Sequence, residues 1–277
     1  MNELWFSLIL FVSSLAAGLL GALSGLGGGV VIVPVLTILF HVDIHYAIGA
    51  SLVSVIATSS GAAAAYVREG FSNIRIGMFL EIATTLGALV GAWLTTKVPT
   101  QAIGIVFGVV LLYSAYASLK AKHEVITDKA DALALRLKLK GTLPLGDGSV
   151  QPYVGQRVPA GFGLMSMAGV LSGLLGIGSG AVKVIAMDQA MLLPFKVSTT
   201  TSNFMIGVTA AASAGLYLRS GYLAPALVMP VMLGVLAGSL IGSGLLVRAR
   251  VRTLKIVFSL LIIAMGVEMI VSNTIGR

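Results

Sequence analysis

Two glycine-rich interruptions of apolar runs constrain this chain more than any other feature of its sequence. The first reads GALSGLGGGVVIVP from Gly21 to Pro34, and the second reads GVLSGLLGIGSGAVK from Gly169 to Lys183. A helix should continue through apolar sequence of this kind, but neighbouring glycines disfavour it through backbone entropy. Inside a bilayer, non-helical backbone survives only where protein buries it or where it lines a wet cavity. Broken membrane helices at corresponding places in two halves are typical of a transporter's substrate site.

The composition indicates a membrane protein. The chain is 57% hydrophobic and only 10% charged, whereas a soluble domain carries about 25% charged residues. Its net charge of +8 comes from Lys and Arg residues in loops between apolar segments, which is typical of cytoplasmic loops rather than of a nucleic-acid surface. Because the chain has no Cys, disulfides, thiolate metal sites and cysteine nucleophiles are excluded. The predicted fold class is therefore an all-α polytopic membrane protein.

Each half of the chain offers four or five transmembrane elements. A spanning helix needs about 20 apolar residues, and the first half has four segments close to that length, Leu4–Leu23, Ala47–Tyr66, Ile76–Thr96 and Ala102–Leu119. The segment Val30–Phe40 is shorter, about 16 Å at 1.5 Å per residue. We therefore expect a broken helix at each glycine motif, with a half-helix after it.

A polar insert separates the two halves, so we divide the chain into a first repeat at 1–119, the insert at 120–158 and a second repeat at 159–277. Leucines alternate with polar or small residues over Leu133–Leu139, and this period of two predicts a strand. Turn residues follow, and Val150–Val154 is the predicted return strand. The insert is either a small amphipathic hairpin against the membrane surface or a basic linker.

The second half repeats the first with an offset of 151 residues from the glycines onward. The matching pairs include Tyr66 and Tyr217, Arg68 and Arg219, Ser51 and Ser202, Gly87 and Gly238, and Phe107 and Phe258. So many matches in register indicate an internal duplication.

The distribution of basic residues predicts an inverted repeat. If five elements cross in each half, fourteen Lys and Arg residues lie on one side of the membrane and three on the other. If the short element turns back instead, the counts are eleven and six. The positive-inside rule favours the first arrangement. It predicts a multi-pass protein of the cell (inner) membrane with the central insert in the cytoplasm.

The glycine motifs and Val33-Pro34 resemble the TauE/SafE family, the sulfite exporter and toluene-sulfonate uptake permease group. So do the segments Ala47–Ser51, Lys183–Val184, Pro194–Val197 and Thr201–Phe204. The chain departs from the family pattern at Ser179, where a glycine is usual, and at Ile185, where a proline would match Pro34. The resemblance implies a secondary carrier of sulfur-containing or organic anions.

The physical argument for an anion rests on the helix ends that follow the glycines. A helix N-terminus presents unsatisfied N–H groups and about half a positive charge, and glycine lets a ligand approach the backbone. The predicted substrate-binding residues of the two motifs are Gly27, Gly28, Gly29, Gly178, Ser179 and Gly180. The alternative is that these glycines simply allow close helix packing.

Lys183 strengthens the prediction of an anion site. It lies three residues after Gly180 in an apolar run, where a cation costs about 2.5–3.5 kcal/mol on insertion scales. It either faces a cavity with a partner or snorkels to the membrane surface. Asp188 is a candidate partner, although its spacing of five residues puts it off the same helical face.

Further polar residues have candidate roles. Ser51, Ser202 and Asn203 can donate hydrogen bonds to an oxyanion, or they can simply bond across helices. Glu81 and Glu268, inside predicted spans, can couple transport to protons, although Glu81 can instead reach the interface. In the segment His41–His45 we expect Asp43 to cap the following helix rather than to bind a metal.

These features predict a secondary transporter that holds a small anion at paired broken-helix N-termini near the membrane midplane. The alternatives are an anion channel with the same site and, less favoured, an intramembrane enzyme, since no catalytic pair of residues stands out. We expect no enzyme activity, no cofactor and no metal. The expected partners are a small anionic substrate and the lipid bilayer, not nucleic acid, and a homodimer is left open.

Overall fold

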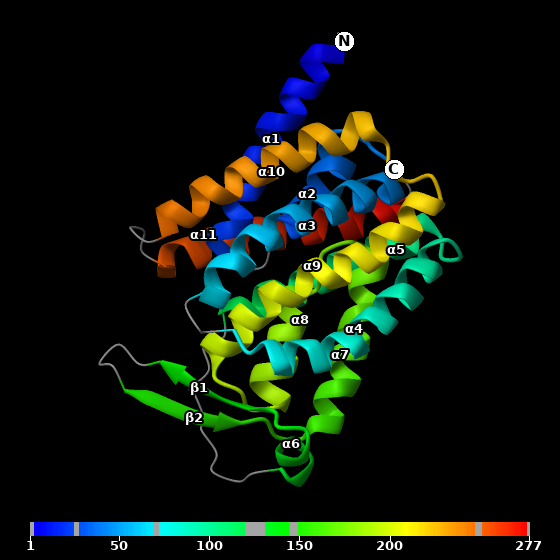
Figure 1. The fold of residues 1–277 in the computed structure, drawn as a ribbon. Coiled ribbons are helices and arrows are strands. Elements are labelled where there is room, and N and C mark those ends of the chain that lie inside the picture. Colours follow the sequence, from blue (N-terminus) through cyan, green and yellow to red (C-terminus); the bar gives the residue numbers. More distant parts are fainter. Residues whose placement is uncertain are drawn as a thin grey trace.

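The computed structural model describes residues 3–24, 28–68, 72–119, 131–144, 149–246 and 251–275. Long helices make up most of it (Figure 1). They are α1 (Glu3–Ser24), α3 (Ile44–Arg68), α4 (Ile74–Thr95), α5 (Thr100–Leu119), α7 (Val158–Leu175), α9 (Phe195–Arg219), α10 (Pro225–Leu246) and α11 (Val251–Ile275). The four long helices predicted for the first half are confirmed, and only their ends move by a few residues.

A short helical segment follows the first helix of each half. Helix α2 (Gly29–Pro34) continues as the π-helix η1 (Val35–Leu39), and α8 (Gly180–Ile185) continues as η2 (Ala186–Ala190). Proline disturbs a helix because it lacks an N–H group and crowds the preceding turn, so Pro34 is the obvious cause of η1. The same π-helix follows Ile185, however, at the equivalent position of the second half. The widened turn therefore does not depend on the proline.

The two halves pack against each other reciprocally. Helix α1 packs on α10 and α4 packs on α7, so the first long helix of each half contacts the third long helix of the other. The equivalent helices α3 and α9 also pack together, as do α5 and α11. This exchange is the pattern that a pseudo-twofold axis between two copies produces, and it means that the core belongs to both halves jointly.

One end of the bundle carries the polar insert, and we call it the hairpin end (Figure 1). Asn73, which precedes α4, donates a side-chain hydrogen bond of 2.9 Å to the hydroxyl of Tyr153 in the insert. The backbone N–H of Gln156, just before α7, donates to the carbonyl of Met191 at 2.9 Å. Because Met191 directly follows η2, this second short segment ends where α7 begins, at the hairpin end.

The opposite end, which we call the His45 end, holds the start of α3. His45 Nε2 lies 3.3 Å from the Thr95 carbonyl at the end of α4, and the His45 ring stacks on Tyr222 with 4.7 Å between centroids. Phe6 on α1 meets Phe40 edge to face at 5.9 Å. Since Phe40 follows η1, the first short segment ends at the His45 end, opposite the end reached by η2.

The described part of the insert contains α6 (Ala132–Arg136), β1 (Lys140–Pro144) and β2 (Val150–Val154). The strands pair antiparallel, with Lys140 opposite Val154. The strand predicted over Leu133–Leu139 is wrong, because Asp131 caps a helical turn there by accepting a 3.0 Å hydrogen bond from the Leu133 N–H. Ala134, Leu139, Leu143 and Tyr153 are buried with residues of α4 and α7, so these parts are packed on the bundle rather than a free linker.

The outer faces of the helices are apolar, as a lipid-facing surface requires. On α4 the exposed side chains Met78, Ile82, Leu86 and Trp93 follow the helical period, and a soluble protein rarely exposes such a stripe. Helices α4 and α7 are long and apolar enough to cross a bilayer. The predicted class, an all-α membrane protein, is confirmed.

Glycines bring α4 and α7 into backbone contact. A Cβ on Gly173 would overlap the Ala88 carbonyl, and one on Gly91 would overlap the Val170 carbonyl. In a bilayer, close approach of this kind is a main source of helix association because lipid removes the hydrophobic driving force.

We therefore expect Gly173→Ala to destabilise the protein by about 1–3 kcal/mol through overpacking. Gly163 on the same helix is the matched control, because an added Cβ there has no neighbour within 4 Å. Gly163→Ala should be neutral or gain up to about 1 kcal/mol of helix propensity. Thermal unfolding of both variants in detergent checks this, and equal melting temperatures would show that the α4–α7 contact has no close-packing requirement.

Candidate functional site

The break between α7 and α8 is built from left-handed backbone. Gly176 and Gly178 both have φ of 68°, and Ser179 has φ of 46°. Glycine adopts this conformation without steric cost, whereas a side chain costs roughly 1–2 kcal/mol. Gly176 ends α7 by donating its N–H to the Ser172 carbonyl at 2.8 Å. The left-handed backbone at Ser179 thus favours glycine, and glycine is the residue that the family resemblance led us to expect at this position.

The described glycines of the first motif lie in close contact with their surroundings. A Cβ on Gly29 would come within 2.7 Å of both Ser51 Oγ and a methyl group of Val55, and one on Gly28 would come within 2.6 Å of a Val235 methyl group. Gly27 lies outside the described residues. These contacts fit the packing role that the sequence left open, and substitution of Gly28 or Gly29 would disturb packing whether or not a ligand binds.

Two equivalent serines bridge the helix breaks to the following helices. Ser51 Oγ on α3 lies within hydrogen-bond distance of two carbonyl oxygens, Gly176 at 2.8 Å and Gly29 at 3.3 Å. Ser202 Oγ on α9 donates to the carbonyl of Gly180 at 3.2 Å. Ser51 therefore joins the first glycine motif to the second, and Gly29 and Gly176 lie close together. The serines, predicted to donate to a ligand, donate to backbone oxygens here, and the neighbouring Asn203 is half-buried.

Lys183 is fully buried and does not reach a membrane surface. Its exposed fraction is 0%. The ammonium group donates a hydrogen bond to Thr209 Oγ1 on α9 and lies 3.8 Å from Glu81 Oε2 on α4. The partner of Lys183 is therefore Glu81 and not Asp188, so the sequence named the wrong carboxylate. Glu81 is itself 5% exposed and does not reach the interface.

Thr209 sits between the two charges. Its hydroxyl lies 2.6 Å from Glu81 Oε1 and 3.0 Å from the carbonyl of Met205, one turn earlier on α9. Thr85 on α4 also donates to Glu81 Oε1, at 3.1 Å. The three helical elements α4, α8 and α9 thus meet in one charged network that spans both halves of the chain.

This network occupies only one side of the pseudo-twofold arrangement. With the offset of 151 residues, the positions equivalent to Lys183, Thr209 and Glu81 are Ile32, Thr58 and Met232. Ile32 is also fully buried, but it carries no charge. The duplicated fold therefore has a charged pair in one copy of the site and an apolar pair in the other.

Three polar atoms near the second break are buried without a hydrogen-bond partner. Among the described residues, Ser172 Oγ, Ser179 Oγ and Glu81 Oε2 have no such partner, although Oε2 faces the Lys183 ammonium. A buried polar atom without a hydrogen-bond partner costs about 1–3 kcal/mol, and such atoms are rare in native structures. An unpaired hydroxyl at the N-cap of α8 is a donor suited to a bound anion or water.

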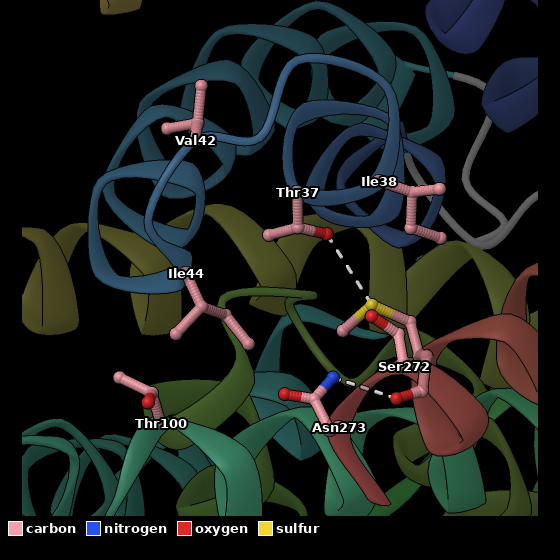
Figure 2. Close-up of a pocket in the computed structure, with 8 residues that line it drawn as sticks. Thr37, Ile38, Val42, Ile44, Thr100, Ser272 and Asn273 are labelled. Carbon is pink, nitrogen blue, oxygen red and sulfur yellow. Dashed lines mark hydrogen bonds between the residues drawn. The ribbon is translucent and has the colours of Figure 1, made fainter. Parts of the chain in front are cut away.

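A separate cavity of about 160 Å³ opens at the His45 end. Figure 2 shows its lining, in which Thr37 and Ile38 of η1 face Ser272 and Asn273 of α11. Thr37 contacts the sulfur of Met269, and Asn273 donates to the carbonyl of the same residue. None of the predicted site residues lines this cavity.

The predicted cap at the start of α3 is confirmed. Asp43 Oδ1 accepts hydrogen bonds of 2.9 Å from the backbone N–H of His45 and from its Nδ1. In the described residues, no cluster of His, Asp and Glu is arranged to hold a metal. The residue that sequence reasoning missed is Thr209, because a threonine in a helix rich in Ser and Thr carries no distinguishing signal.

The strained backbone at Ser179 leads to a stability prediction. Ser179→Gly should raise the free energy of unfolding by about 1 kcal/mol, because glycine removes the left-handed Cβ penalty. Ser179→Ala is the matched control, since it removes the hydroxyl but keeps the Cβ. Thermal melting of the two variants separates the effects, and equal melting temperatures would contradict strain at this position.

Comparison of the sequence with known proteins identifies the family. The sequence matches the family Sulfite exporter TauE/SafE over residues 10–269. It is 29% identical to the probable membrane transporter protein YunE of Bacillus subtilis, over 95% of this chain and 96% of that protein. It is 27% identical to the probable membrane transporter protein YdhB of the same organism, over 85% of this chain and 87% of that protein. A probable membrane transporter protein of Xylella fastidiosa is 25% identical over 95% of both chains.

No solved structure matches the chain. The family match covers nearly the whole sequence, including both glycine motifs and the segment that carries Lys183. The chain therefore belongs to the TauE/SafE sulfite exporter family of membrane transporters.

Proposed function

We propose that this membrane transporter carries small sulfur-containing or organic anions, such as sulfite or a sulfonate, and binds them beside Lys183 where the two helix breaks meet. The observation that carries the proposal is the complete burial of Lys183 on α8, three residues after the helix begins at Gly180. A cation in a membrane helix usually marks a substrate or ion pathway. An anion is the ligand whose charge the position favours.

The electrostatics of α8 support an anion. The N-terminus of a helix carries partial positive charge, and Lys183 adds a full positive charge three residues after α8 begins. Glu81 supplies one negative charge at 3.8 Å. The unpaired hydroxyl of Ser179 is a further donor without charge, and the first N–H groups of a helix have no partner within it.

We further propose that the two halves form an inverted repeat across the membrane. The two short segments, η1 and η2, end at opposite ends of the bundle, which supports this orientation. The positive-inside rule then places the insert and the hairpin end in the cytoplasm.

Single-cysteine labelling tests the inverted repeat, and the absence of native Cys keeps the background clean. Glu69→Cys and Ser220→Cys occupy equivalent positions 151 residues apart. We expect a membrane-impermeant thiol reagent to label Glu69→Cys from the inside and Ser220→Cys from the outside. Labelling of both from the same side would rule out the inverted repeat.

Anion binding by purified protein tests the site. We expect sulfite or methanesulfonate to bind, and Lys183→Gln to weaken binding at least about tenfold, because a hydrogen bond to a charged group contributes about 1.5–3 kcal/mol. Lys97→Gln, which removes an exposed lysine, is the matched control and should bind normally. Unchanged affinity in Lys183→Gln would remove the electrostatic basis of the proposal.

Counterflow in liposomes separates the carrier from its alternatives. A carrier exchanges its substrate faster when the same anion is present on the far side, whereas a channel shows no such acceleration. We expect acceleration. Flux without it would indicate an anion channel that uses the same site, and chemical conversion of the anion would indicate an enzyme.

A further inference from the structure

We propose that Glu81 is an internal counter-ion that pairs with Lys183 while the site is empty. An entering anion displaces the Glu81 carboxylate from Lys183, and that carboxylate then takes up one proton. The inference rests on the proposed function, because it requires an anion at Lys183. It adds a mechanism that couples anion binding to proton uptake.

The geometry supports a replaceable pair rather than a locked one. Glu81 Oε2 lies 3.8 Å from the Lys183 ammonium, which is longer than a charge-assisted hydrogen bond of about 2.7–2.9 Å. The ammonium donates its hydrogen bond to the neutral Thr209. The carboxylate therefore balances the charge without holding the ammonium tightly, and an anion with closer contact can replace it.

Thr209 can follow the exchange without losing a hydrogen bond. A hydroxyl has one proton, and two acceptors lie within reach of this one, Glu81 Oε1 at 2.6 Å and the Met205 carbonyl at 3.0 Å. When Glu81 leaves or becomes neutral, the hydroxyl can turn to Met205. Its oxygen stays available to accept the hydrogen bond from Lys183 in both states.

The charges and protons balance in one exchange. The empty site holds one ammonium and one carboxylate, so its net charge is zero. A monovalent anion then pairs with the ammonium, and the displaced carboxylate takes one proton from the aqueous compartment that the site faces. An unpaired carboxylate in a low-dielectric interior is too costly to stay ionised. The loaded site is again neutral, and release of the anion returns the proton to water.

Other titratable groups on the surrounding elements are separated from this pair. Arg75 begins α4, Arg157 precedes α7, and Lys196 and Arg219 lie at the two ends of α9. Tyr113 and Tyr116 on α5 are at least half exposed. The Tyr217 hydroxyl lies within hydrogen-bond distance of Thr95 Oγ1 and of the Gly173 carbonyl. The remaining one is Asp188, on η2 after α8, and the carboxylate that faces the Lys183 ammonium is that of Glu81 instead. Proton uptake with the anion is therefore assigned to Glu81.

The affinity of the purified full-length protein for methanesulfonate, sulfite and thiosulfate tests the inference. Methanesulfonate is the main probe, because its own charge does not change between pH 5.5 and pH 8.5. For the unmodified protein we expect weaker binding as the pH rises, by up to about tenfold per pH unit, because one proton enters with each anion. Glu81→Gln should bind more tightly at high pH and lose this dependence, since no internal anion competes.

The matched control is Glu268→Gln, which removes an exposed carboxylate on α11 and should keep the pH dependence of the unmodified protein. Glu81→Asp covers the case in which Glu81→Gln fails to fold. Its shorter carboxylate should keep the pH dependence and bind the anion more tightly than the unmodified protein.

Each result decides between the two proposals. If none of the three anions binds to the unmodified protein, the proposed function fails and this inference fails with it. If an anion binds but its affinity is independent of pH, or if Glu81→Gln keeps the pH dependence, only the internal counter-ion is overturned.

Discussion

The buried ion pair between Lys183 and Glu81 is the interaction on which the proposed anion site depends. The two residues come from different halves of the chain, and Thr209 on a third helix joins them. Removing two charges from water costs several kcal/mol per ion, and mutual attraction often fails to repay that cost. A pair of this kind is therefore weak support for a purely structural role, and the site is better explained by a ligand that uses the charge.

The surrounding fold brings the pair together through reciprocal packing. Helix α4 of the first half lies against α7 and α9 of the second, and glycines such as Gly173 allow the backbones to touch. Ser51 then joins the two helix breaks through the carbonyls of Gly29 and Gly176. The frame is nearly symmetric, but Ile32 and Met232 replace the charged pair in the other copy. The two halves thus share the same backbone arrangement, and they differ at these two positions, which carry charge in only one copy of the site.

Much of the fold could be predicted from the sequence because local patterns determine it. Apolar run lengths located the long helices, and the glycine motifs located the short segments Gly29–Leu39 and Gly180–Ala190. The period of two over Leu133–Leu139 misled, because Asp131 caps a helical turn that competes with a strand. One of the two alternatives for Lys183, burial beside a charged partner, is confirmed, but the sequence analysis proposed Asp188 as that partner instead of Glu81. A contact between α8 and α4 depends on how the halves exchange helices, and spacing along one helix cannot reveal it.

The most direct measurement is the stability and anion response of a variant in which both charges are replaced by apolar side chains of similar length, Lys183→Met with Glu81→Met. Replacing a buried ion pair by apolar residues is often neutral or stabilising. If the pair serves anion transport, this variant should melt at or above the temperature of the unmodified protein, and methanesulfonate should no longer shift that temperature. A variant that melts at a much lower temperature, or one that still responds to the anion, would contradict the role proposed for the pair.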